Sequence, residues 1–228
     1  MKSRRLRRAA AAVVCAVALS SCASAHPGSA AEVGDTSISD DTLQQSTAGF
    51  CDLIASVNAA QQGSTADVPL RSAVLTALNT LVMGEALDQL AARNDVSVSN
   101  AEVRGWIDQL PLDFSTVPAP RIEDLQAVTS RVARNTLLVE KLGRVVYERQ
   151  NPGGGNPPPN QIQQLGQQLA SGYLNQVDVE TNPRYGQVLD TQRLPGTGSL
   201  SLPVSEEGMA GRTVPQASGS LGETQKCS

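Results

Sequence analysis

The chain has 228 residues, of which 40% are hydrophobic and 3% aromatic, and its formal net charge at pH 7 is −4. This length fits one modest domain with accessory segments. The sequence has no basic stripe with interleaved aromatic residues, which disfavours nucleic-acid binding. Its only histidine is His26, which excludes histidine-based nucleophilic catalysis and most zinc sites.

Residues 1–21 carry the features of a secretory signal. Five basic residues precede an apolar run over residues 9–19, about half of the roughly 20 residues that a membrane-spanning helix needs. The small residues before Cys22 complete a sequence similar to the bacterial lipoprotein signal, in which the cysteine is diacylated and becomes residue one of the mature protein. We therefore predict a palmitate-type lipid anchor on Cys22 and a location on the extracytoplasmic face of the cell membrane. The alternative is an ordinary signal with a chance cysteine.

The predicted mature chain is acidic. Removal of residues 1–21 leaves 13 Lys and Arg against 22 Asp and Glu, a net charge of about −9. Electrostatic attraction to anionic lipid is therefore disfavoured, which leaves the lipid itself as the membrane contact. Residues 22–30 are small and polar and predict a flexible stem between the lipid and the domain.

Two further cysteines, Cys51 and Cys227, remain in a compartment that permits disulfides. A bridge between them would join the end of the chain to the first helix. The alternative is that Cys51 is a small core residue and Cys227 a free thiol, and the sequence favours neither.

A domain is predicted over residues 31–149. Two short strands flank Gly34-Asp35 as a hairpin, and Ser39 can cap a helix that ends near Gly63. Residues 70–93 then predict a long amphipathic helix, because apolar residues recur at three- and four-residue intervals. Its expected apolar face holds Val74, Leu75, Leu78, Leu81, Val82 and Leu90, and its expected polar face holds Thr76, Asn79, Asp88 and Gln89.

A second helix starts with a clear capping signal. Ser99 and Glu102 have the spacing of a capping box, and Val98 can close over Val103 as a hydrophobic staple. The expected buried face holds Val103, Trp106, Ile107 and Leu110. Pro111, Pro118 and Pro120 break the chain before a further helix that begins near Glu123. Its expected buried stripe is Leu125, Val128, Val132, Val139, Leu142 and Val146, with Arg131, Arg134, Glu140, Lys141 and Arg144 outside.

The run NPGGGNPPPN predicts a linker over residues 150–160, because it is incompatible with a helix or a central strand. Residues 161–190 are expected to complete the domain with a helix, whose buried face holds Ile162, Leu165, Leu169 and Tyr173, and a strand over 177–181 that pairs with the hairpin. Residues 191–228 predict a mostly disordered tail with one possible strand at 200–204. The predicted fold is mainly α (α+β), with a small two- to three-stranded sheet closed by a late C-terminal strand.

No sequence motif for a cofactor, metal or catalytic triad is present. The acidic pair Asp40-Asp41 and the pair Glu123-Asp124 lie in first helical turns, where carboxylates stabilise the helix. We therefore expect no enzyme activity and no cofactor. Arg184 and Tyr185 could form a ligand clamp, but a structural role, with the arginine pairing with an acid, is favoured.

The order of elements resembles the N-terminal domain of SurA- and PrsA-like chaperones, in particular actinobacterial lipoproteins that contain this domain. The resemblance covers residues 31–185, and its most specific parts are residues 98–103 and 182–186. Complete foldases of this kind insert a parvulin isomerase domain between the long helices and the closing strand. Here residues 151–160 occupy that junction, so the resemblance does not extend to isomerase activity.

The resemblance implies a lipid-anchored, non-catalytic chaperone whose partners are unfolded or nascent exported polypeptides. Client peptides would bind an apolar crevice, for which the candidate residues by position are Trp106, Leu110, Leu112 and Phe114. The alternative for Trp106 is a core plug. Rival functions are a structural, partner-specific envelope lipoprotein and, with less support, a prolyl isomerase. The sequence does not indicate the oligomeric state.

Overall fold

The computed structural model describes residues 28–60, 68–110, 112, 114, 117–153, 155–185 and 223–227. It confirms a mainly helical fold with one small antiparallel sheet. The strands are β1 (Ser29–Val33), β2 (Thr36–Ser39) and β3 (Val179–Thr181). The helices are α2 (Asp40–Ala60), α3 (Leu70–Arg93), α4 (Asn100–Ile107), α5 (Ile122–Gln150) and α6 (Pro159–Leu174), with short 3₁₀ turns η3 (Ala119–Arg121) and η4 (Glu223–Gln225). Within these described ranges no helix has both the length and the apolar character that crossing a membrane requires.

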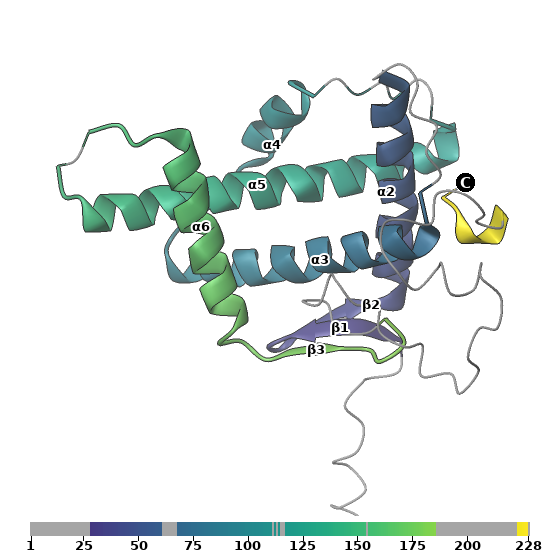
Figure 1. Ribbon diagram of the computed structural model, residues 1–228, viewed down its shortest axis with the longest axis horizontal. Helices are drawn as coiled ribbons and strands as arrows, with labels where there is room; N and C mark the ends of the chain where they lie inside the picture. Colours follow the sequence, from purple (N-terminus) through teal and green to yellow (C-terminus); the bar gives the residue numbers. More distant parts are fainter. Residues whose placement is uncertain are drawn as a thin grey trace, which may run out of the picture.

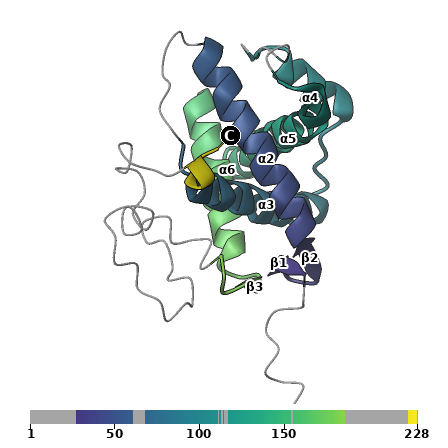
Figure 2. The ribbon, with the colours of Figure 1, turned by 90° about the vertical axis from the view of Figure 1, so that its right-hand side faces the viewer.

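The helices form a crossed arrangement around α3 and α5 (Figure 1). These two helices lie side by side, α2 crosses them at one end, and α6 crosses them nearer the other end. The sheet lies against α3 on the side away from α5, and α4 covers α5 on its opposite side. Figure 2 shows the same molecule turned by 90°, with η4 lying beside α2 and α3.

The sheet has the order β2-β1-β3, so the strand that comes last in the sequence pairs with the first. Ala31 lies opposite Ile38 on one side and Thr181 on the other. Gly34, at the first position of the two-residue hairpin loop, has a φ of 58°, which glycine adopts without steric cost. The predicted pairing of the late strand with the hairpin is confirmed.

The predicted stem is shorter than residues 22–30. Ser29 and Ala30 belong to β1, and Ala30 is fully buried. The reason is a contact with Asn182, which follows β3. Its side chain donates to the Ser29 carbonyl at 3.0 Å, and its backbone N–H donates to the Ala30 carbonyl at 2.9 Å. A distant partner therefore extends a strand that its own composition does not predict.

The predicted N-caps of α2 and α4 are confirmed. The Ser39 hydroxyl accepts the Thr42 N–H at 3.1 Å at the start of α2. At α4 both halves of the capping box are present, since the Ser99 hydroxyl accepts the Glu102 N–H and the Glu102 carboxylate accepts the Ser99 N–H. The expected end of the first helix at Gly63 lies outside the described residues.

The expected polar face of α3 is only partly open to solvent, since Thr76 is exposed and Asp88 and Gln89 are half-buried. Asp88 accepts hydrogen bonds from Arg131 and Arg134 of α5. Gln89 donates to the Val33 carbonyl at 3.0 Å and accepts from the Tyr173 hydroxyl at 2.9 Å. The two arginines, expected on the outside of α5, lie at its margin because α3 supplies their partner.

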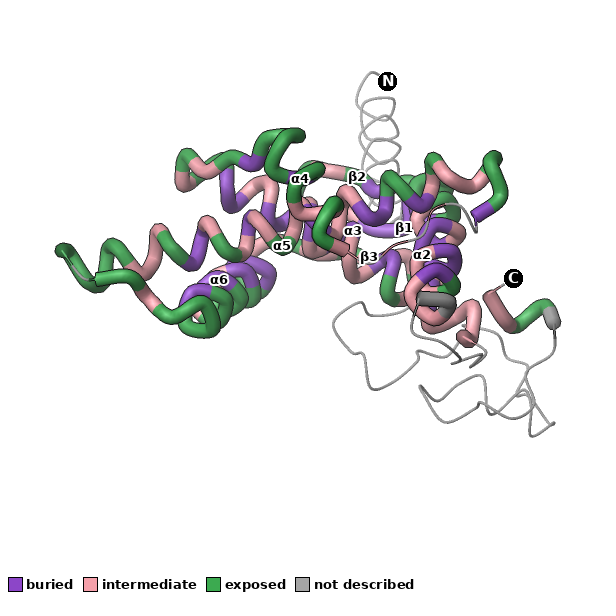
Figure 3. Tube along the Cα trace, turned by 90° about the horizontal axis from the view of Figure 1, so that it is seen from above, coloured by how far each residue is buried: buried purple, intermediate pink, exposed green. Residues whose placement is uncertain are grey.

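The expected buried stripes are only partly correct. Figure 3 shows buried residues along α3 and α5, whereas α4 is mostly exposed or intermediate. On α4 only Val103 is buried, and Trp106, Ile107 and Leu110 are half-buried. On α5 the buried set is Leu125, Val128, Thr129, Ala133, Leu138, Leu142 and Gly143, so Val132, Val139 and Val146 lie at its margin.

Helix α6 begins two residues earlier than expected and packs more closely than its sequence suggests. Pro159 occupies its first turn, where the missing N–H is not needed, so the last two residues of the proline-rich run are helical. A Cβ on Gly143 would lie 2.0 Å from the Ile162 carbonyl oxygen, and one on Gly166 would lie 2.0 Å from that of Val139. On α6, Ile162 at this contact and Tyr173 against α3 are buried, whereas Leu165 and Leu169 are half-buried.

Candidate functional site

The four residues predicted to bind peptide lie at the end of α4 and in the segment that follows it. Trp106 packs partly against the hydrophobic core, and Leu110, Leu112 and Phe114 are each half-buried. Trp106 is therefore neither a fully buried core plug nor a fully exposed contact. The two hollows described below are lined by other residues, and the role of these four side chains in binding stays a prediction.

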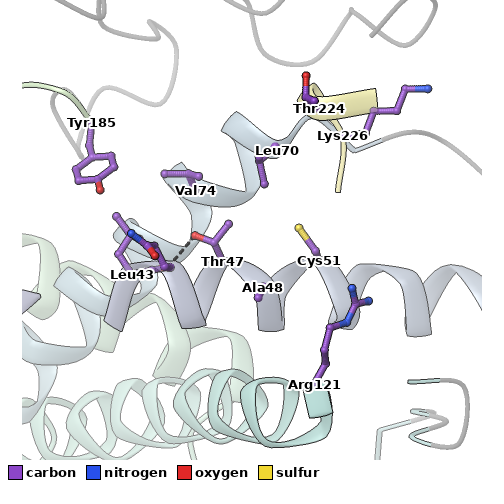
Figure 4. A pocket seen from close by; sticks show the side chains of 11 residues that line it. Leu43, Thr47, Ala48, Cys51, Leu70, Val74, Arg121, Tyr185, Thr224 and Lys226 are labelled. Carbon is purple, nitrogen blue, oxygen red and sulfur yellow. Dashed lines mark hydrogen bonds between the residues drawn. The ribbon is translucent and has the colours of Figure 1, made fainter. Parts of the chain in front are cut away.

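One hollow is an apolar groove of about 390 Å³ between α2 and the start of α3 (Figure 4). We call it the α2–α3 groove. Leu43, Thr47 and Cys51 of α2 form its buried floor, and the half-buried Leu70 and Val74 of α3 form one wall. Its full lining is Leu43, Gln44, Thr47, Ala48, Cys51, Leu70, Val74, Arg121, Tyr185, Thr224 and Lys226. The groove can accept an apolar side chain.

The groove brings together segments that are far apart in the sequence. Cys51 and Cys227 form a disulfide that joins positions 176 residues apart. Of the two alternatives that the sequence left open, the structure therefore contains the bridge and not a free Cys227 thiol. The Cys227 N–H also donates to the Val68 carbonyl at 2.9 Å, and Lys226 forms an antiparallel bridge with Pro69. The end of the chain is thereby fixed beside the groove.

Tyr185 lies at the opposite end of the groove from Thr224 (Figure 4). Its hydroxyl donates to Asp40 at 3.1 Å, and burial raises the pKa of the hydroxyl, helped by the Asp40 carboxylate. Arg184 forms an ion pair with the same carboxylate, and this hydrogen bond raises the pKa of the arginine. Arg184 therefore pairs with an acid, as the structural interpretation expected, while Tyr185 contributes its ring to the groove.

Below the groove, α2 carries polar side chains that are almost completely buried. Asp52 is 2% exposed and forms an ion pair with Arg121, which also lines the groove. Burial of a carboxylate costs free energy unless a charged partner compensates, so this pair fixes η3 against α2. Among the residues that the structure describes, no group of three or more His, Cys, Asp or Glu side chains is placed to hold a metal ion.

The second hollow has a volume of about 590 Å³ and lies between α3, α5 and α6. Met83, Leu87, Val139 and Ile162 give it an apolar floor, and Asn135, Gln163 and Gln167 add amide groups. Its rim includes Glu140 and Arg144, which form an ion pair at 3.4 Å. This hollow is more polar than the α2–α3 groove and is bounded on one side by the loop that precedes α6.

The first half of the chain matches a known protein family. A family model described as the SurA-like N-terminal domain matches residues 8–117. This segment is a SurA-like N-terminal domain. The match begins inside the predicted signal and ends before α5, so it covers β1, β2, α2, α3 and α4. No curated protein and no solved structure shows a significant match to the chain.

The match confirms the resemblance to SurA-type domains and indicates a chaperone-type, non-catalytic domain. Cys22 and His26 lie outside the described residues, as do residues 200–204. The α2–α3 groove was not predicted from the sequence. No local signal in the sequence places Tyr185 or the 223–227 segment beside Leu43 and Cys51.

Proposed function

We propose that this protein is a lipid-anchored extracytoplasmic chaperone that binds unfolded exported polypeptides without catalysing a reaction. The observation that carries the proposal is the apolar α2–α3 groove within a chain that contains a SurA-like N-terminal domain. Ligand sites are typically concave and mostly apolar, with a few polar groups at the edge. Here Leu43, Leu70 and Val74 supply the apolar surface, and Gln44 and Thr224 supply polar groups at the rim.

The groove suits a ligand recognised by apolar side chains and not by charge. Two cationic residues, Arg121 and Lys226, belong to its lining. Arg121 forms an ion pair with Asp52, and Asp40 at the Tyr185 end forms one with Arg184. Unfolded polypeptides expose apolar side chains that folded ones bury, so an open apolar groove distinguishes the two. Trp106, Leu110, Leu112 and Phe114 form a second candidate contact surface on the other side of α5.

The direct test is suppression of aggregation. The purified protein at an equimolar ratio should slow the aggregation of several unrelated unfolded proteins, measured by light scattering. Val74→Gln should weaken this effect because it places an amide in the apolar wall. Val146→Gln changes a half-buried valine of α5 outside the groove and is the matched control. Failure to protect any of the test proteins would reject the chaperone function.

The rival function is a structural, partner-specific envelope lipoprotein. In-cell crosslinking that captures one dominant partner, with no protection of general clients, would favour this rival. A prolyl isomerase would accelerate turnover of a proline peptide above the uncatalysed rate, and we expect no such turnover. The lipid anchor has its own test, since Cys22→Ser should release the protein from membranes on fractionation.

A further inference from the structure

The C-terminal segment 223–227 lines one end of the α2–α3 groove. Thr224 and Lys226 contribute to its lining together with Cys51 and Leu70 (Figure 4). Residues 223–225 form the 3₁₀ turn η4, and the two residues after it are bound as an added strand would be, because the Cys227 N–H donates to the Val68 carbonyl and Lys226 bridges Pro69. The structure therefore shows a strand-like backbone contact at this end of the groove.

The segment 223–227 is only partly buried. Thr224 and Gln225 are exposed, and Lys226 and Cys227 are half-buried. The pairing cannot lengthen through Pro69, because proline has no N–H to donate. A covalent link raises the effective concentration of such a segment, so a free polypeptide competes poorly with it. The bridge therefore adds to the non-covalent contacts of the segment, in which Gln225 and Lys226 take part.

The two sulfur atoms differ in accessibility. Cys51 is 8% exposed on the floor of the groove, whereas Cys227 is half-buried at its end. Thiol–disulfide exchange needs access of the attacking thiolate to a sulfur atom, so attack on the bridge is expected from the side of the less buried residue, Cys227. Loss of the bridge would expose the part of the groove next to Cys51 and would release the Val68 carbonyl from its hydrogen bond with the Cys227 N–H.

Resting on the proposed function, we propose that the Cys51–Cys227 disulfide controls access to the α2–α3 groove. In the oxidised protein, segment 223–227 closes the end of the groove at which an extended segment of an unfolded polypeptide with apolar side chains would bind. A dithiol reductant opens the site. One thiolate of the reductant attacks the Cys227 sulfur, forms a mixed disulfide with it and releases the Cys51 thiolate. The second thiol of the reductant then attacks the reductant's own sulfur in the mixed disulfide and releases Cys227. The products are the Cys51 and Cys227 thiols and the oxidised reductant, with two electrons and two protons transferred to the protein.

The test measures binding of a permanently unfolded, cysteine-alkylated polypeptide that carries a fluorophore, by fluorescence anisotropy against the full chain. Alkylation prevents exchange between the probe and the bridge. We expect Cys227→Ser to bind the probe about tenfold more tightly than the oxidised wild type, because it removes the tethered competitor. Treatment with a dithiol should raise the wild-type affinity to the same level and leave Cys227→Ser unchanged.

A second variant locates the effect. Val74→Gln combined with Cys227→Ser should lose the gain, whereas Val146→Gln combined with Cys227→Ser should retain it, and circular dichroism checks that each variant is folded. Equal affinities of the oxidised wild type and Cys227→Ser would overturn the inference while leaving the proposed function intact. A gain that survives Val74→Gln would also overturn it. Absence of binding by every form would reject the proposed function itself.

Discussion

The contact of α5 with the next helix, α6, and the contact of α2 with the segment 223–227 hold their partners in opposite ways. At the first, Gly143 and Gly166 let two helix backbones touch, and no side chain could be added there without displacing the partner. At the second, a disulfide holds a partly exposed segment beside an open groove. Close backbone packing excludes a ligand from the contact itself, whereas a covalent link joins two segments without filling the space between them.

Removal of the disulfide should have the largest effect on stability. The variant Cys51→Ala/Cys227→Ser should lose about 2–4 kcal/mol of unfolding free energy, because the bridge restricts the unfolded chain over a long loop. Urea unfolding under non-reducing conditions measures the loss. Wild type treated with a reductant should show the same midpoint as the variant, and an unchanged midpoint in both would show that the bridge is absent from the protein in solution.

Gly143→Ala should disrupt the contact between α5 and α6. The added methyl group would meet the Ile162 carbonyl at 2.0 Å, so the helices must separate, and we expect a loss of about 1–3 kcal/mol in urea unfolding. Gly172→Ala on α6 is the matched control, since a Cβ there has no neighbour within 4 Å. It should be neutral or stabilising by up to about 1 kcal/mol through helix propensity. Equal effects of the two substitutions would contradict the close packing.

Asp88 joins α3 to α5 by polar contacts alone and should have an intermediate effect. Its carboxylate lies 3.1 Å from Arg131 and 2.8 Å from Arg134. Asp88→Asn should cost about 1–2 kcal/mol in chemical unfolding, because it weakens charged hydrogen bonds that are partly shielded from water. Glu140→Gln, which removes an exposed ion pair with Arg144, should change stability by no more than about 0.5 kcal/mol.

The smallest effect concerns pH. Hydrogen bonds from Lys141 and Ser99 lower the pKa of Glu102 from 4.5 to about 2. Between these values the unfolded chain binds more protons than the folded one, so the contribution of Glu102 is complete above about pH 4.5 and is lost as the pH falls through about 2. The stability advantage of wild type over Glu102→Gln should therefore shrink over that range. An advantage that does not depend on pH would contradict this assignment.

The sequence predicts those features that depend on neighbours along the chain. The capping box at Ser99 and Glu102, the hairpin at Gly34 and the long helix from Leu70 all follow from local spacing. The late strand was also predictable, because a two-stranded ribbon alone is marginal and residues 177–181 alternate.

The sequence does not predict features that need a partner from elsewhere in the fold. Asp88 and Gln89 have the appearance of solvent-facing residues until α5 and Tyr173 are placed against them. The same holds for the α2–α3 groove, whose lining residues come from five separate parts of the chain. The number of cysteines allowed the Cys51–Cys227 bridge but did not require it, since only the fold brings the two together.

The pairing of β1 with β3 also has a consequence for the time course of folding. The hydrogen bond from Asn182 to Ser29 spans 153 residues, and closure of so long a loop slows the step that forms it. During synthesis, β1 therefore has only β2 as a strand partner until residues 179–181 have emerged. Its other edge remains unpaired until then, so completion of the sheet waits for a segment made about 150 residues later.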